Sequence, residues 1–263
     1  MSEPVLLVDV DGGVATVTLN RPTTRNALSH ELLGALEATM VELAGRDDVG
    51  AVILTGADPA FCAGLDLKEL SGSDRLLDGG GEARQPSSYP WAPLGKPLIG
   101  AVNGVAVTGG LELALNCDFL IASERAMFAD THARVGVMPG WGLTVLLPQR
   151  VGFAMARRMS FTGDFVDAPT ALRAGLVTEV VAHDDLLPVA RRVAATIVSN
   201  NRPGVLRIHS IYRRVEAEVT APQLAVELEE SLRWRREGRT AGLADRVPGV
   251  MSRGRDQSGR TGR

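Results

Sequence analysis

The sequence predicts an α/β fold with parallel strands, followed by a mainly helical C-terminal region. Three short apolar runs, at 51–55, 97–102 and 119–122, are typical of buried strands. A helical pattern at 109–117 lies between the last two runs, and buried strands that alternate with helices indicate parallel crossover units rather than a sandwich. Strand patterns nearly vanish after about residue 150. Helical patterns then follow at 152–160, 168–174, 184–200, 203–218 and 221–237.

The first elements predicted are a hairpin and an amphipathic helix. β-rich runs at 5–9 and 14–19 flank the sequence Asp-Gly-Gly at 11–13, which is typical of a tight turn between antiparallel strands. Leucine and methionine then recur at helical spacing over 30–45. Ser29 is suited to cap this helix, because its hydroxyl can accept a hydrogen bond from a free amide of the first turn.

Composition divides the chain into regions. Gly, Arg and Ser dominate the last stretch, 251–263, so we expect a disordered tail there. Gly, Ser and Pro also crowd together in 71–92, which predicts a mobile surface segment.

Overall composition excludes several classes of protein. The chain has 263 residues, and 28 basic against 31 acidic side chains give a net charge of −3, so no nucleic-acid footprint is expected. No apolar stretch approaches the ~18 residues of a membrane span, and no secretory signal is recognised. Cys62 and Cys117 form neither a disulfide framework nor a metal-ligand spacing. We therefore expect a soluble, cytoplasmic protein without a metal.

Directly after the strand at 51–55 comes FCAGLDLKE, at 61–69. Small residues followed by a helix-like run predict a turn that enters a helix N-terminus, where free amides and the helix dipole favour negative charge. The alternative is a tight strand-to-helix connection that binds no ligand.

A second strand runs into glycines and a helix at 101–118, AVNGVAVTGGLELALNCD. Glu112 stands between Leu111 and Leu113 in a helix whose other positions look buried. A carboxylate there costs several kcal/mol unless it is paired, hydrogen-bonded or protonated. Glu112 is therefore either a general acid or base, or a core side chain satisfied by a nearby arginine or backbone amide.

Taken together, these blocks resemble the crotonase (enoyl-CoA hydratase/isomerase) superfamily, over about residues 5 to 240. The matching blocks, in order, are NRP at 20–22, NAL at 26–28, FCAGLDLKE at 61–69, AVNGVAVTGGLELALNCD at 101–118 and PGWG at 139–142. The resemblance implies an α/β spiral of ββα turns in 1–200 that carries an acyl-coenzyme A site, followed by helices in 201–250 that carry trimer contacts. It also implies a homotrimer or a dimer of trimers. No separate cofactor is expected, since coenzyme A is part of the substrate.

The resemblance further implies an oxyanion hole formed by the backbone amides of Leu65 and Gly109. Two such donors would stabilise the enolate of the thioester, and loss of one typically costs ~3 kcal/mol of barrier stabilisation. The segment from Ala63 to Lys68 would cradle coenzyme A, and Arg25 could meet one of its phosphates. The substrate-binding residues expected are Arg25, Ala27, Ala63, Leu65, Asp66, Leu67, Lys68, Gly109 and Trp141.

For catalysis, Glu112 falls at the position of the first catalytic glutamate of enoyl-CoA hydratases. The second should lie twenty residues further on, where this chain has His132. His132 could transfer protons, and Asp130 is another candidate if the stretch is extended, because it would then lie on the same face. The alternative for His132 is a polar lining residue. Thr108 replaces a usual glycine and could narrow the pocket, and Trp141 either shapes the acyl pocket or belongs to the core.

The reaction favoured is hydration of a 2-enoyl-CoA to the 3-hydroxyacyl-CoA, with Glu112 activating water and His132 or Asp130 as a proton relay. An isomerase, a decarboxylase or a thioester hydrolase would use the same oxyanion hole. A catalytically weak acyl-CoA-binding protein is the alternative of another class: the retained Glu112 argues against it, and His132 argues for it.

Overall fold

The computed structural model describes residues 3–66, 69, 88–239 and 243–258 and contains two sheets. The strands are β1 (Leu6–Asp11), β2 (Val14–Leu19), β3 (Ala51–Gly56), β4 (Ala60–Cys62), β5 (Leu98–Val102), β6 (Val105–Val107), β7 (Phe119–Ser123), β8 (Met127–Ala129), β9 (Val166–Asp167) and β10 (Glu179–Val181). The α-helices are α1 (His30–Gly45), α3 (Gly109–Leu115), α4 (His132–Val135), α5 (Leu143–Thr162), α6 (Ala168–Ala174), α7 (Leu186–Ser199), α8 (Arg202–Arg236) and α9 (Leu243–Ser258). Short 3-10 helices occupy Pro22–Thr24 and His183–Asp185.

The strands form a spiral. The larger sheet has the order β1-β2-β3-β5-β7-β10, and the smaller has β4-β6-β8-β9. Successive turns of the chain place one strand in each sheet and then a helix: β5, β6 and α3, followed by β7, β8 and α4. The equivalent strands pair in parallel, whereas β1 and β2 form the antiparallel hairpin. The predicted hairpin and the ββα spiral are therefore confirmed.

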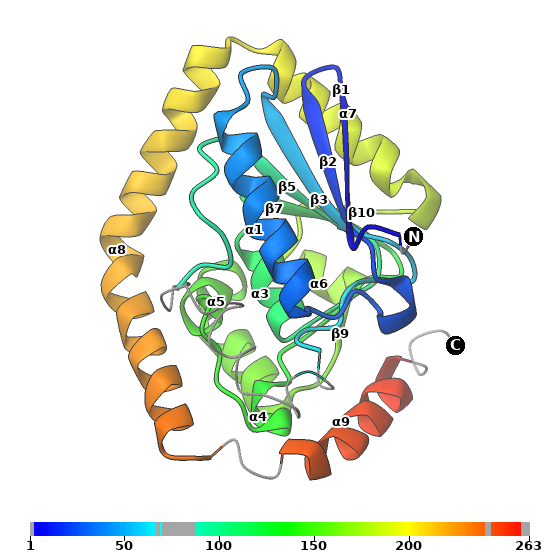
Figure 1. Ribbon diagram of the computed structural model, residues 1–263, viewed down its shortest axis with the longest axis vertical. Coiled ribbons are helices and arrows are strands. Elements are labelled where there is room, and N and C mark those ends of the chain that lie inside the picture. The colour runs from blue at the N-terminus through cyan, green and yellow to red at the C-terminus, as the bar shows by residue number, and fades with distance from the viewer. Residues whose placement is uncertain (1–2, 67–68, 70–87, 240–242, 259–263) are drawn as a thin grey trace.

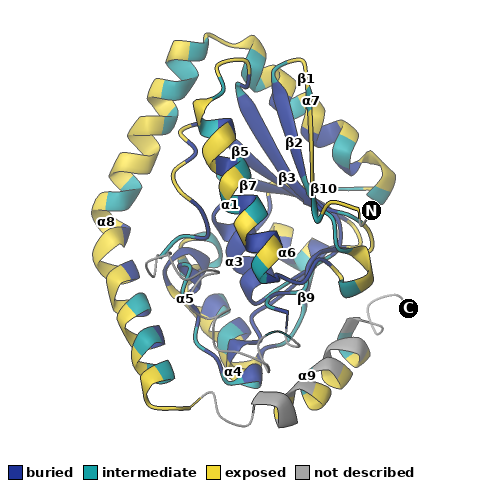
Figure 2. Cartoon of the chain, viewed as in Figure 1, coloured by how far each residue is buried: buried dark blue, intermediate teal, exposed yellow. Residues whose placement is uncertain are grey.

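Both faces of the larger sheet are covered, which explains why its strands read as continuous apolar runs. In β3, Val52 and Leu54 belong to the core on the side of α1, and Ile53 belongs to a second cluster with side chains of α7. Figure 1 shows α1 crossing the face of this sheet, and Figure 2 shows its inner strands fully buried. The Ser29 hydroxyl caps α1 as predicted, accepting a hydrogen bond from the amide of Leu32 at 3.2 Å.

The C-terminal region differs from the prediction in three ways. The two helices expected at 203–218 and 221–237 are one continuous helix, α8, which Figure 1 shows along one side of the molecule. Pro222 lies inside this helix, which continues through it although proline lacks a backbone donor. Strands also persist after residue 150, since β10 extends the larger sheet by pairing with β7.

The third difference concerns the tail. Helix α9 runs to Ser258, so the disordered tail predicted from 251 is wrong over 251–258. The reason is packing against the body of the protein: the Arg246 guanidinium donates to the carbonyl of Val135 at 3.0 Å. Residues 259–263, and most of the mobile segment predicted at 71–92, lie outside the described residues. In the part of the chain that is described, no helix combines the length and apolarity needed to cross a bilayer.

Candidate active site

The first motif pairs with the loop that precedes α1. The amide of Leu28 donates to the carbonyl of Gly64 at 2.8 Å, and the amide of Asp66 donates to the carbonyl of Leu28 at 2.9 Å. In a parallel ladder of this kind, the residue between the two bonded positions turns its own amide to the opposite side. The Leu65 N–H therefore points away from Leu28.

The second motif brings another amide to the same place. Gly109 begins α3, so its N–H has no acceptor one turn earlier in the helix. The two motifs approach closely, since a Cβ atom on Gly64 would lie 3.5 Å from the nitrogen of Gly109. Leu65 and Gly109 both line one cavity. Its lining residues are Leu65, Gly109, Glu112, His132, Val137, Met138, Gly140, Trp141, Ser231 and Arg235.

The substitution Gly64→Ala is expected to lower the free energy of unfolding by at least about 2 kcal/mol. Gly64 has φ +89°, a left-handed conformation that costs other residues roughly 1–2 kcal/mol, and the added Cβ would meet the carbonyl oxygen of Val107 at 2.9 Å. Urea unfolding would measure the loss. Gly34→Ala is the matched control, because that helical glycine faces open space and should gain up to about 1 kcal/mol. A Gly64→Ala protein as stable as the parent would contradict this account.

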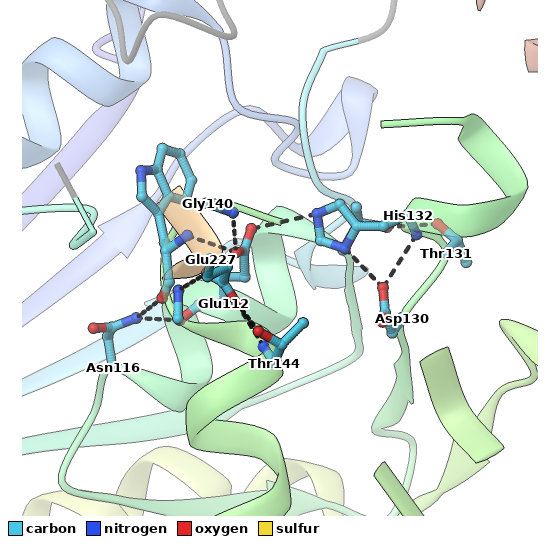
Figure 3. Close-up of polar contacts among 11 residues, drawn as sticks. Glu112, Asn116, Asp130, Thr131, His132, Gly140, Thr144 and Glu227 are labelled. Atoms are coloured by element: carbon cyan, nitrogen blue, oxygen red, sulfur yellow. Dashed lines mark hydrogen bonds and ion pairs between the residues drawn. The ribbon is translucent and has the colours of Figure 1, made fainter. Parts of the chain in front are cut away.

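Glu112 is buried at the base of the cavity, with only 3% of its surface exposed. Its Oε1 atom accepts hydrogen bonds from the amides of Gly140 at 3.0 Å and Trp141 at 2.8 Å. These donors offset the cost of burying the carboxylate. Its other oxygen, Oε2, lies 3.5 Å from Nε2 of His132, as Figure 3 shows.

His132 stands between two carboxylates. Its Nδ1 atom lies 2.7 Å from Oδ1 of Asp130, which also accepts the backbone amide of His132 at 3.1 Å. Burial alone would lower the pKa of His132, but the hydrogen bonds and negative charges of Asp130 and Glu112 raise it to about 10. His132 is therefore an imidazolium at neutral pH. Nδ1–H is held by Asp130, and Nε2 lies 3.5 Å from the Glu112 carboxylate.

Asp130 reaches His132 by a route that the sequence reasoning did not predict. An extended stretch would have placed the two side chains on one face of a strand. Instead β8 ends at Ala129, and His132 is the first residue of α4, so the contact is made across a turn. Burial would raise the pKa of Asp130, but the hydrogen bond and charge of His132 lower it, so Asp130 is ionised.

Thr108 does not narrow the cavity, since it is not among the lining residues. It precedes α3 with φ +54°, a conformation uncommon outside glycine. Its hydroxyl instead shares a hydrogen bond with that of Thr131, 2.5 Å away. This bond connects the start of α3, which carries Gly109, to the residue before His132.

The residues predicted to hold coenzyme A lie on two adjoining loops. Arg25 is exposed, and its carbonyl accepts the amide of Ala63 at 3.0 Å. The Arg21 guanidinium donates to the carbonyl of Ala27 and forms an ion pair with Asp66 at 2.9 Å. Asp66 therefore helps to join the two loops. Its contact with coenzyme A, like those of Arg25, Ala27 and Ala63, stays a prediction.

Leu67 and Lys68, also predicted to bind the substrate, lie outside the described residues. Trp141, by contrast, lies at the cavity wall. Its ring is close to α3, because a Cβ atom on Gly109 would be 3.7 Å from it. Its carbonyl accepts a hydrogen bond from the Asn116 side chain at 2.9 Å, which holds the loop at 139–142 against α3.

Helix α8 supplies residues that the sequence reasoning missed. Ser231 and Arg235 line the cavity, and the buried Glu227 lies one turn earlier on the same face of the helix. No local signal marks these positions, since α8 is polar and largely exposed along its length. Within the described ranges, no group of His, Cys, Asp or Glu side chains could hold a metal ion.

This arrangement suits proton transfer beside a stabilised oxygen. Glu112 can accept a proton, the imidazolium of His132 can donate one, and the two are 3.5 Å apart. The amides of Leu65 and Gly109 line the same cavity, where they could stabilise an oxyanion.

Comparison with known proteins identifies the family. A family model described as enoyl-CoA hydratase/isomerase matches residues 9–234. The short-chain-enoyl-CoA hydratase of Clostridium acetobutylicum is 37% identical over 228 residues, covering 85% of this chain and 87% of its own. A "probable enoyl-CoA hydratase" of Rhizobium meliloti is 39% identical over 242 residues, covering 90% and 88%.

The crystal structure of an enoyl-CoA hydratase from Mycobacterium smegmatis superposes with a TM-score of 0.81 at 56% identity, covering 89% of this chain and all of that one. The fold is thus the crotonase fold. The chain belongs to the enoyl-CoA hydratase/isomerase family of enzymes.

Proposed function

We propose that this enzyme hydrates 2-enoyl-CoA thioesters to 3-hydroxyacyl-CoA. The observation that carries the proposal is the contact between Glu112 and His132 beside the amides of Leu65 and Gly109. Hydration needs both a base for water and an acid for the α-carbon, and this pair supplies one of each. The enoyl-CoA hydratase names of the relatives support the same activity.

In the first step, the thioester oxygen accepts hydrogen bonds from the amides of Leu65 and Gly109, which draws electron density away from the β-carbon. Glu112 then takes a proton from water as the water oxygen bonds to the β-carbon. The electron pair of the carbon–carbon double bond moves to form the enolate, whose charge is stabilised by the two amides.

In the second step, Nε2–H of His132 gives its proton to the α-carbon, and the thioester carbonyl is restored. Glu112 now holds a proton and His132 is neutral. The proton returns from Glu112 to Nε2 across their 3.5 Å contact, which resets the site. One water is consumed. One of its hydrogens stays in the hydroxyl group on the β-carbon, and the other ends on Nε2 of His132, where it replaces the proton given to the α-carbon.

Incubation with crotonyl-CoA tests the proposal, because hydration removes the absorbance of the conjugated enoyl thioester. We expect that absorbance to fall without release of free thiol. Thiol release would indicate a thioester hydrolase, and growth of enoyl absorbance from a 3-enoyl-CoA without loss from crotonyl-CoA would indicate an isomerase. Binding of acyl-CoA with no turnover would leave only the binding-protein alternative and reject the hydratase.

We also propose that the enzyme is a homotrimer or a dimer of trimers in the cytoplasm. Apolar side chains recur along one face of α8, at intervals of mostly three, four or seven residues, and each is more than half exposed. The stripe consists of Ile208, Ile211, Tyr212, Val215, Val219 and Val226. A surface of this kind favours contact with another copy of the chain. The free, buried thiols of Cys62 and Cys117 support a reducing compartment.

A further inference from the structure

Glu227 is a buried carboxylate to which neither the fold prediction nor the proposed reaction assigns a role. Only 7% of its surface is exposed, and it lies on α8, far in sequence from the groups that it contacts. It accepts hydrogen bonds from the amide of Gly142 at 2.6 Å, the amide of Thr144 at 2.7 Å and the hydroxyl of Thr144 at 2.5 Å. These donors belong to the start of α5, where a carboxylate also matches the helix dipole.

The residues just before these donors hold Glu112. Gly140 and Trp141 give their amides to Oε1 of Glu112, and Gly142 and Thr144 give theirs to Glu227. The turn at 140–144 therefore lies between two carboxylates and supplies two amides to each. Figure 3 draws both glutamates together with Gly140 and Thr144 of this turn.

We propose that Glu227 is a positioning residue for the hydration reaction, acting through the turn at 140–144 to hold the Glu112 carboxylate against His132. The proposal rests on the function proposed above. With Oε1 of Glu112 bound to the turn, Oε2 is directed to Nε2 of His132. If the turn moved, both the base and its distance to the acid would change. A displacement of 1 Å at such a group can cost about 10²-fold in rate.

Packing and charge agree with this coupling. The turn is pressed against α8, since a Cβ atom on Gly142 would lie 2.9 Å from the side chain of Leu224. Burial raises the pKa of Glu227, and the negative charge of Glu112 raises it further. The two carboxylates are thus close enough to repel each other, and the amides between them offset that repulsion.

The alternative is that Glu227 only caps α5, a stabilising role with no link to Glu112. A double-mutant cycle separates the two roles. Glu227→Gln removes the charge and replaces one acceptor oxygen by an NH₂ group that faces an N–H donor. It would be measured in the parent and in a Glu112→Gln background, with Glu229→Gln, an exposed glutamate of the same helix, as the matched control.

In the parent, we expect Glu227→Gln to lower kcat for crotonyl-CoA by about tenfold or more, with KM changed by less than about threefold, because coenzyme A contacts are untouched. In the Glu112→Gln background it should cost less than about twofold, since the group that it positions is already disabled. Glu229→Gln should leave both constants unchanged. An equal loss of kcat in both backgrounds overturns the proposal, and so does a Glu227→Gln enzyme whose kcat is within about twofold of the parent value.

If Glu227→Gln does not fold, the Thr144 hydroxyl provides the second test. Thr144→Val should lower kcat several-fold, and Thr144→Ser, which keeps the hydroxyl, should restore it. Equal activity of both variants would overturn the proposal. A parent enzyme that does not hydrate crotonyl-CoA rejects the proposed function itself, whereas an active parent with unaffected variants rejects only the role of Glu227.

Discussion

Replacement of Glu112 by glutamine is expected to lower kcat for hydration of crotonyl-CoA by about 10²- to 10⁴-fold, the range typical of a general base. Glutamine keeps an oxygen that can accept the amides of Gly140 and Trp141, so the turn should stay in place. The amide side chain cannot take a proton from water. The loss should therefore fall on kcat and leave KM little changed.

Initial rates of loss of the enoyl absorbance would measure this effect, and calorimetric titration with a saturated acyl-CoA would check that binding survives. Glu124→Gln is the matched control, since that glutamate is exposed and is not among the residues that line the cavity. A Glu112→Gln enzyme with the parent kcat would show that another group activates water, and the mechanism would have to be abandoned.

The second large effect is a change in the pH dependence of kcat, which reports the protonation of His132. Its pKa of about 10 makes it a proton donor at neutral pH, and that donor is lost as pH rises through about 10. We expect kcat to fall on the alkaline side near that pH. His132→Gln should lower kcat by about 10²- to 10⁴-fold and remove this alkaline fall. Asp130→Asn should keep activity at low pH but move the fall to lower pH, because the carboxylate that raises the pKa is gone.

The same pKa affects stability. The folded value lies above the ordinary value near 6.5, so the contribution of His132 to the free energy of unfolding is complete below pH 6.5 and is lost as pH rises through about 10. Urea unfolding as a function of pH would measure this contribution.

The control for the pH dependence of kcat is His209→Gln, which replaces a histidine that pairs with Asp118. It should leave the alkaline fall of kcat unchanged. An alkaline limb that does not move in Asp130→Asn would rule out His132 as its source.

Much of the fold could be predicted from local pattern. The strands at 51–55, 97–102 and 119–122 could be recognised in the sequence because both faces of the larger sheet are buried, which favours continuous apolar runs. The α1 helix was legible for the opposite reason, since only one of its faces is buried. Local pattern failed in α8, where it predicted a break that tertiary packing does not require, and in α9, whose composition alone indicated disorder.

For the candidate site, too, some residues could be predicted from the sequence and others could not. Glu112 could be found because a charged residue among leucines is locally anomalous. Leu65 and Gly109 could be found because their motifs match the family in register, and His132 because it stands where the family has its second catalytic glutamate. Glu227 could not be found. A glutamate in a polar helix has no anomaly of its own, and its partners, Gly142 and Thr144, are more than 80 residues away.

The sequence by itself therefore determined the crotonase fold, the two backbone donors of the expected oxyanion hole and the carboxylate beside them. Only the tertiary structure decided that Asp130, His132 and Glu112 lie in one series of polar contacts, and that α8 lines the cavity with Ser231 and Arg235. The physical reason is the distance along the chain over which each kind of interaction acts. Helix and strand patterns reflect burial of neighbouring residues, whereas hydrogen bonds and charge coupling depend on where separately folded elements come to lie.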